Sequence, residues 1–273
     1  MAAKSKKRKT VAESVDPHRL YQAAVQCPEF ELEFIHTVFK EHRKRAPRHM
    51  REDFCGTALA CAQWVERHRE NTAVGVDLDN DVLEWGRVNN IEVLKPSQRK
   101  RVTLLSENVL KTSTRDAFDI IQAMNFSYWI LMERKQLLSY FKRARKALAS
   151  DGMLVLDAFG GYAAHQSGSE TRKLDGFSYE WEQASFNPVT NVMQCYIHFA
   201  FKDKSRLERA YSYRWRLWGA AEIRDVLAEA GFASTHMYLQ AFDPDTDEAL
   251  DEYVCTDECE DHACWLGYVV ALA

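Results

Sequence analysis

Arg51-Glu52-Asp53-Phe54-Cys55-Gly56-Thr57-Ala58-Leu59 is the stretch that determines how this chain folds. It predicts the end of a strand, a tight turn at Gly56 and the start of a helix in immediate succession. Thr57 is a good helix N-cap, and the apolar residues behind it have the spacing of a helix with one buried side, namely Leu59, Cys61, Trp64 and Val65. In an α/β sheet such a turn leaves backbone N–H groups beside the carboxyl ends of the strands, where these sheets bind ligands.

A carboxylate closes the next apolar run. Ala73-Val74-Gly75-Val76-Asp77-Leu78-Asp79 has the composition of a buried second strand that ends at Asp77. A carboxylate at this place can accept hydrogen bonds from both hydroxyls of a ribose. The ligand suggested by the turn and Asp77 together is a nucleoside.

At these residues the chain resembles the class I S-adenosylmethionine-dependent methyltransferases, whose first motif is an acidic residue, a Gly-x-Gly-x-Gly turn and a helix. Glu52 takes the acidic place, and Phe54, Gly56 and Ala58 take the three glycine places. S-adenosylmethionine has no phosphate, so the loss of two glycines counts against a nicotinamide cofactor more than against a methyl donor. The resemblance implies a doubly wound, Rossmann-like α/β fold with a seven-stranded methyltransferase sheet, and S-adenosyl-L-methionine as cofactor.

The resemblance also implies positions for the cofactor along the chain. Asn108 follows the third predicted strand, Arg101 to Leu105, at the place where the family binds the adenine amino group. An Asn offers a donor and an acceptor for an adenine edge, although at such a place it can equally be a turn residue. The predicted cofactor-binding residues are Tyr21, Arg51, Glu52, Cys55, Gly56, Thr57, Asp77, Leu78, Asn108, Val109 and Met124.

The predicted acceptor side follows the fourth strand, with Asn125 and Tyr128. Family members that methylate nucleobase amino groups carry an Asn that holds the amine and an aromatic residue that stacks on the base, but the two prolines of their motif are missing here. We therefore expect a small-molecule substrate and keep a nucleobase as an alternative. The predicted catalytic residues are Asn125, Tyr128 and His165; His165 follows the fifth strand and is a candidate general base or else a surface histidine.

The reaction implied is methyl transfer to a nitrogen or oxygen acceptor. Such a displacement needs chiefly an acceptor held in line with the methyl group, and a general base helps without being required. Two other hypotheses stay open. One is a non-catalytic nucleoside-binding or scaffold module that kept the fold, and the other is a nicotinamide oxidoreductase, which the altered turn disfavours.

Strands alternate with helices from residue 48 to 160, as in a doubly wound parallel sheet. The period then changes to strict alternation in three strands from Phe177 to Trp218, which predicts an antiparallel β insertion at about 165–218 after strand five. Its aromatic face walls a substrate pocket, forms a homodimer contact or packs the insertion's own core. Two further strand-like segments lie at Thr235 to Phe242 and Trp265 to Leu272. The resemblance implies that they complete the sheet and that the last one runs antiparallel to the others.

The predicted domains are a basic flexible tail (1–15), an N-terminal helical lid (16–48) and a methyltransferase domain (49–273). The basic run Lys4–Lys9 is a nuclear import signal, a weak nucleic-acid arm or a solvated tail. Composition is that of a soluble protein, with 46% hydrophobic and 28% charged residues and a net charge of −4. No apolar run approaches the roughly 20 residues that span a bilayer, so no membrane partner is expected.

Seven cysteines are an odd number, and several fall in predicted core elements, which indicates a reduced, cytoplasmic setting. Cys255, Cys259, His262 and Cys264 could in principle hold zinc. Their spacing is tight and matches no paired-knuckle arrangement. We expect a solvated acidic loop there and no metal.

Overall fold

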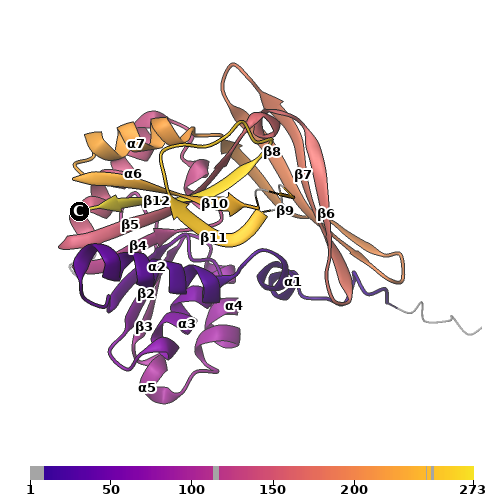
Figure 1. Cartoon of the computed structure of the whole chain (residues 1–273). Helices are drawn as coiled ribbons and strands as arrows, with labels where there is room; N and C mark the ends of the chain where they lie inside the picture. The colour runs from indigo at the N-terminus through magenta and orange to yellow at the C-terminus, as the bar shows by residue number, and fades with distance from the viewer. Residues whose placement is uncertain (1–8, 113–116, 244, 247–248) are drawn as a thin grey trace, which may run out of the picture. The chain divides into compact units, whose positions relative to one another are not determined.

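The computed structural model describes residues 9–112, 117–243, 245–246 and 249–273 (Figure 1). The chain divides into two compact units. Unit 1 consists of residues up to Gln26 together with His165–Arg216, and unit 2 consists of Cys27–Ala164 and Leu217–Ala273.

Unit 2 is built on an eight-stranded sheet in the order β11-β10-β12-β5-β4-β1-β2-β3 (Figure 1). Its strands are β1 (His49–Asp53), β2 (Thr72–Asp77), β3 (Val102–Ser106), β4 (Phe118–Ala123), β5 (Leu148–Gly160), β10 (Ser234–Phe242), β11 (Ala249–Cys255) and β12 (Trp265–Leu272). The first five strands run parallel, and β12 lies antiparallel to both β5 and β10. The predicted α/β fold and its antiparallel last strand are confirmed. The additional edge strand is β11, which lies between the last two predicted strands in the sequence.

Helices cover both faces of this sheet. α2 (Pro28–Arg43) packs with α3 (Leu59–Arg67) on one face, and α6 (Arg134–Ala147) packs with α7 (Ala220–Glu229) on the other (Figure 1). Each turns an apolar stripe inward, as the spacing of its apolar residues requires. The shorter elements of the fold are α4 (Asn80–Gly86), α5 (Pro96–Arg99), the π-helical turn η1 (Arg87–Ile91) and the 3₁₀ turns η2 (Ser127–Ile130) and η3 (Tyr162–His165).

The core under α2 and α3 is apolar except near the carboxyl ends of β1 and β4. Ile35 and Phe39 of α2 and Trp64 of α3 are fully buried against Met50 and Ile120 of the sheet. Successive residues of a strand point to opposite faces, so the side chains that continue this row toward the carboxyl ends of β1 and β4 are Glu52 and Gln122. Polar groups therefore stand on the same face as the core, at the edge where ligands bind.

Unit 1 contains α1 (Pro17–Ala24) and an antiparallel sheet of β6 (Gly168–Lys173), β7 (Phe177–Asn187), β8 (Val192–Phe201) and β9 (Arg206–Arg216). The sequence predicted only three of these strands. All six residues of β6 are exposed, so this edge strand has no apolar alternation to reveal it. Leu20 and Ala24 of α1 belong to the core of this sheet, and so α1 and α2 fall in different units. The lid role expected for residues 16–48 stays a prediction.

The acidic stretch after β11 is not arranged as a metal site. No group of His, Cys, Asp and Glu side chains in the described part of the chain could hold a metal ion. The His262 ring stacks on Phe242 at 4.2 Å, and Asp257 forms an ion pair with Arg224 at 2.7 Å. The described helices include none with the length and apolar character needed to cross a membrane. Of the basic run, residues 4–8 lie outside the described residues.

Candidate functional site

The turn after β1 has left-handed backbone at all three glycine places of the motif. Phe54, Gly56 and Ala58 have φ values of 59°, 51° and 54°. For a residue with a Cβ this conformation costs roughly 1–2 kcal/mol. The chain thus retains the backbone path of a glycine-rich turn although it has a single glycine there. The helix begins one residue later than predicted: Ala58, not Thr57, is the N-cap of α3, and no side chain caps it.

Close packing beneath the turn holds this path. The Cys55 N–H donates to the Val76 carbonyl at 3.0 Å. The Cys55 side chain fills the space above Gly75, where a Cβ would come within 2.8 Å of Sγ. Gly86 of α4 lies so close to the Thr57 carbonyl that a Cβ there would collide with it. Small residues at both positions are therefore needed for the turn to sit between β2 and α4.

Asp77, at the end of β2, ties the turn to the neighbouring strand. Its Oδ2 accepts a hydrogen bond from the Gly56 N–H at 2.7 Å, and its Oδ1 accepts one from the Asp79 N–H at 3.0 Å. The Asp77 carbonyl in turn accepts from the Glu107 N–H at 3.0 Å, which brings Asn108 to the same edge of the sheet. The Asn108 Oδ1 accepts from the Leu110 N–H at 2.8 Å, so part of this side chain serves the local turn.

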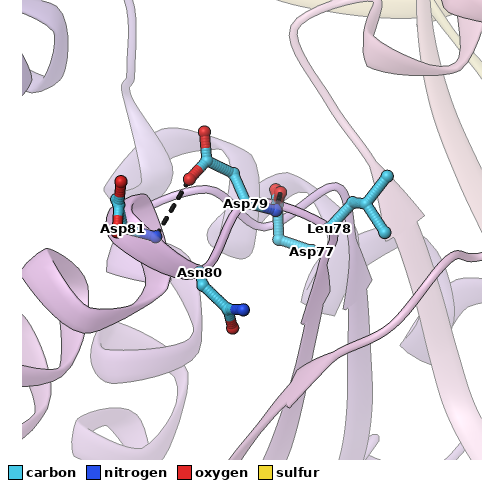
Figure 2. Close-up of a pocket in the computed structure, with 5 residues that line it drawn as sticks. All are labelled: Asp77, Leu78, Asp79, Asn80 and Asp81. Carbon is cyan, nitrogen blue, oxygen red and sulfur yellow. Dashed lines mark hydrogen bonds between the residues drawn. The ribbon is translucent and has the colours of Figure 1, made fainter.

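An open pocket of about 480 Å³ lies over the end of β2 (Figure 2). Its lining comprises Asp77, Leu78, Asp79, Asn80 and Asp81. Figure 2 shows the Leu78 side chain extending away from the carboxylates of Asp79 and Asp81. Leu78 is 67% exposed, unusual for a leucine and suited to an apolar ligand surface. The pocket offers carboxylate acceptors on one side and an apolar side chain on the other.

The other predicted residues lie as follows. Cys55, Thr57, Val109 and Met124 are buried. Asn125 is partly buried in the loop after β4. Tyr21 and His165 belong to unit 1, where Tyr21 packs on Tyr211 at 4.7 Å and His165 on Phe186 at 5.2 Å between ring centroids.

Two predicted site residues have buried side chains. Arg51 is 1% exposed and points to the α6 face, where it pairs with Asp53 at 2.9 Å; the Tyr140 hydroxyl also donates to Asp53, at 3.0 Å. Tyr128 is fully buried, and its hydroxyl donates to the Asp157 carbonyl at 2.9 Å. Arg51 is thus a packing residue below the site, and the Tyr128 ring has no free face on which an acceptor could stack.

The loop after β4 is strained where Tyr128 was expected to act. Asn125 and Phe126 are consecutive left-handed residues, with φ values of 57° and 56°. Such backbone costs of order 1–3 kcal/mol per residue and is found at functional sites more than elsewhere. The Phe126 N–H donates to Oδ1 of the buried Asp157 at 2.9 Å, which fixes the loop against β5.

A buried polar group on the α2 face was largely missed from the sequence. The Glu52 Oε2 accepts from the Cys61 N–H at 3.3 Å and from its thiol at 3.1 Å. Burial raises the pKa of Glu52 to about 8 and that of Asp157 to about 8. Glu31 of α2 adds to both shifts by charge repulsion, and burial raises its own pKa to about 7. The Glu31 carboxylate is thus close enough to Glu52 and to Asp157 to add to the rise in the pKa of both.

Asp157 and Glu31 could have been recognised as candidate site residues from the sequence. Asp157 closes the apolar run Met153–Leu156 just as Asp77 closes its own strand. Glu31 lies three and four residues before Phe34 and Ile35, so it falls in the apolar stripe of α2. A carboxylate at such a position is a sign of a buried polar site.

Comparison with known proteins identifies the fold. No family model and no curated protein matches the chain. Solved structures do match: an S-adenosylmethionine-dependent methyltransferase from Clostridium acetobutylicum ATCC 824 is 17% identical over 93% of this chain and 97% of its own, with a TM-score of 0.67. CalS10 from Micromonospora echinaspora is 13% identical over 98% of both chains (TM-score 0.65), and KedS8 from Streptoalloteichus sp ATCC 53650 is 16% identical over 98% of both (TM-score 0.60). The chain has the fold of the class I methyltransferases.

Replacing Ala58 by glycine tests the strained turn. Glycine adopts a positive φ without steric cost, so Ala58→Gly should recover roughly 1–2 kcal/mol of strain that offsets the loss of a buried methyl group. Ala60→Gly is the matched control, because Ala60 is also buried but lies inside α3. We expect Ala58→Gly to be at least about 1 kcal/mol more stable than Ala60→Gly in urea denaturation. Equal losses would mean that the turn stores no strain.

The buried carboxyls predict a pH dependence of stability. Glu52 and Asp157 bind protons more tightly in the folded state, since their pKa values rise from 4.5 and 3.8 to about 8. Their contribution is fully present below about pH 4 and is lost as pH rises to about 8, with a slope of up to about 1.4 kcal/mol per pH unit for each group. Thermal denaturation from pH 5 to 9 should show this fall, and Glu52→Gln should flatten it. The exposed Glu66→Gln should leave it unchanged.

Proposed function

We propose that this protein is an S-adenosylmethionine-dependent methyltransferase that acts on a nitrogen or oxygen atom of a small molecule. The observation that carries the proposal is the turn of residues 54–58, left-handed at all three glycine places and bonded through Gly56 to the Asp77 carboxylate. The turn and the carboxylate stand at the carboxyl ends of β1 and β2, where open α/β sheets bind nucleosides.

The residues present fit this cofactor. A Cβ at Gly56 would meet only Val82 Cγ1, at 3.9 Å, so a ligand can approach the backbone of the turn from that side. The pocket beside it carries three carboxylates, at Asp77, Asp79 and Asp81. Carboxylates attract the positive sulfonium and accept bonds from ribose hydroxyls, whereas they repel a pyrophosphate. The same pocket is therefore poorly suited to a dinucleotide.

Each part of the site then has a role. The backbone at Gly56 would face the methionine end, Asp77 would accept bonds from the ribose, and Leu78 would cover one face of the adenine. Asn108 remains the candidate for the adenine amino group. Bound S-adenosylmethionine supplies an electrophilic methyl group, and the contribution of this chain is to hold the acceptor in line with it.

A small-molecule acceptor is favoured over a nucleobase. CalS10 is described as an amino pentose methyltransferase and KedS8 as a sugar N-methyltransferase. In this chain the aromatic residue expected to stack on a base, Tyr128, is buried. A non-catalytic nucleoside-binding module remains the second candidate, because Phe54 and Ala58 replace two glycines of the motif. The cytoplasmic location, a homodimer contact through the insertion and a nucleic-acid role of the basic tail stay predictions.

Cofactor binding tests the proposal directly. We expect S-adenosylmethionine and S-adenosylhomocysteine to raise the melting temperature and NAD to leave it unchanged, because a ligand that binds only the folded state stabilises it by mass action. Calorimetric titration gives the affinities. Tight binding of NAD without a response to either sulfur nucleoside would overturn the proposal. Binding of both sulfur nucleosides, with no methyl transfer in a screen of amines and alcohols, would favour the non-catalytic module.

Asp77→Ala should weaken S-adenosylhomocysteine binding at least about tenfold, because each charge-assisted bond to the ribose is worth roughly 1.5–3 kcal/mol. Asp81→Ala is the matched control: it removes the same charge from the same pocket, at an exposed position in the first turn of α4. Melting temperature reports whether each variant is folded. An unchanged dissociation constant in folded Asp77→Ala would place the ribose elsewhere.

A further inference from the structure

Three carboxyl groups and one amide lie near the carboxyl ends of the parallel strands, on the sheet face that α2 covers. They belong to Glu31, Glu52, Asp157 and Gln122. Glu52 of β1 is paired in register with Gln122 of β4, and Gln122 with Val155 of β5. Asp157, two residues further along β5, points to the same face and is paired with Tyr268 of β12. These side chains therefore form a row across four neighbouring strands.

Glu31 extends this row from the helix side. Phe34, one turn along α2, stacks on Tyr268 with ring centroids 4.5 Å apart, and Phe30 packs on Tyr253 at 5.5 Å. Burial raises the pKa of Tyr253 and of Tyr268, as it does those of Glu52 and Asp157, and the Glu31 carboxylate adds to each of these shifts. Glu31 thus lies in the same helical turn as Phe30 and Phe34, whose rings pack on Tyr253 and Tyr268.

The burial of these groups is not balanced by a cation. Glu52 and Asp157 are 6% and 7% exposed. Within the described residues, no Lys, Arg or His forms an ion pair with Glu31, Glu52 or Asp157. A buried carboxylate without a positive partner is costly, so each of these groups favours its protonated form or a bound cation.

Gln122 is an independent sign that a ligand belongs here. Its side chain is fully buried and lies beside the Glu52 carboxyl. The amide interacts with the Glu52 carboxylate through a side-chain hydrogen bond, while its Oε1 has no hydrogen-bond partner among the described residues. Buried amides are nearly always fully hydrogen-bonded, so the open Oε1 beside these carboxyls points to a polar group that the protein itself does not supply.

The row adjoins the predicted acceptor side. Glu31 and Tyr253, at the α2 end of the row, are partly exposed. At the other end, Asp157 accepts hydrogen bonds from the backbone of Phe126 and Asn125 in the strained loop after β4. Carboxylates flanked by aromatic faces are the usual surroundings of a bound ammonium group, because both attract positive charge.

We propose that Glu31, Asp157 and the aromatic rings of Phe34, Tyr253 and Tyr268 bind the acceptor as an aliphatic amine, and that the carboxyl row takes its proton. This inference rests on the proposed methyltransferase function and makes nitrogen the accepting atom. In the proton transfer, one N–H bond of the ammonium breaks, an O–H bond forms on a carboxylate, and the electron pair stays on nitrogen. The amine is then neutral and nucleophilic, as methyl transfer requires. Gln122 and Glu52 form the end of the row on the side of the methyl donor.

Calorimetry with cyclohexylamine and with cyclohexanol tests the binding site, because the two probes have the same ring and differ in charge. We expect cyclohexylamine to bind the full-length protein at least about tenfold more tightly than cyclohexanol. Titrations at pH 7 in two buffers of different ionisation enthalpy should show that protons are released to the buffer, since a carboxyl that is protonated in the free protein must first lose that proton before it can pair with the ammonium and act as its base. Equal binding of the two probes, or binding without proton release, would overturn the inference.

The Glu31→Gln variant locates the probe. It should weaken cyclohexylamine binding at least about tenfold and leave the affinity for S-adenosylhomocysteine within about twofold. Glu29→Gln is the matched control, because Glu29 is an exposed carboxylate in the first turn of the same helix. If Glu31→Gln instead weakens S-adenosylhomocysteine and spares cyclohexylamine, the row holds the amino group of the donor and the inference is wrong. Absence of S-adenosylhomocysteine binding in the unaltered protein would overturn the proposed function alone, since the amine titrations do not depend on it.

Discussion

The hydrogen bond from the Gly56 N–H to the Asp77 carboxylate, 2.7 Å long, is the interaction on which the rest of the site depends. It joins the turn after β1 to the end of β2 and so fixes the backbone that a nucleoside would meet. The turn is costly, because Phe54 and Ala58 adopt left-handed backbone that favours glycine. The packing around the turn offsets this cost. Because Gly75 and Gly86 have no side chains, Cys55 and Thr57 can lie directly against them.

The two faces of the central sheet differ in whether their buried carboxylates are paired with a cation. On the α6 face, the buried Asp53 carboxylate forms an ion pair with Arg51. On the α2 face, Glu52 and Asp157 are buried without a cation partner among the described residues. A protein that maintains such a row loses stability at neutral pH unless something positive binds there. The contrast suggests that the first face supports the fold and the second serves ligand binding.

Both proposed ligands carry a positive charge. The pocket over β2 and the row under α2 both present carboxylates, and both would be matched by positive groups: a sulfonium in the first and an amine in the second. Deprotonation of the amine resolves the repulsion that two cations would otherwise feel during methyl transfer. The raised proton affinity of the row is thus consistent with the chemistry proposed for it.

The sequence by itself determined the alternation of strands and helices, the turn at Gly56 and Asp77 at a strand end, because these depend on periodicity and on local backbone preferences. The antiparallel last strand was expected only from the resemblance to the class I methyltransferases. It could not reveal β6, whose residues are all exposed, or predict that Tyr128 and Arg51 are buried. Only the tertiary structure brought Glu31, Glu52, Gln122 and Asp157 together, since they come from α2, β1, β4 and β5 and meet through strand register and helix packing. Burial and mutual repulsion, which set the proton affinity of these groups, arise from that meeting and have no counterpart in the linear chain.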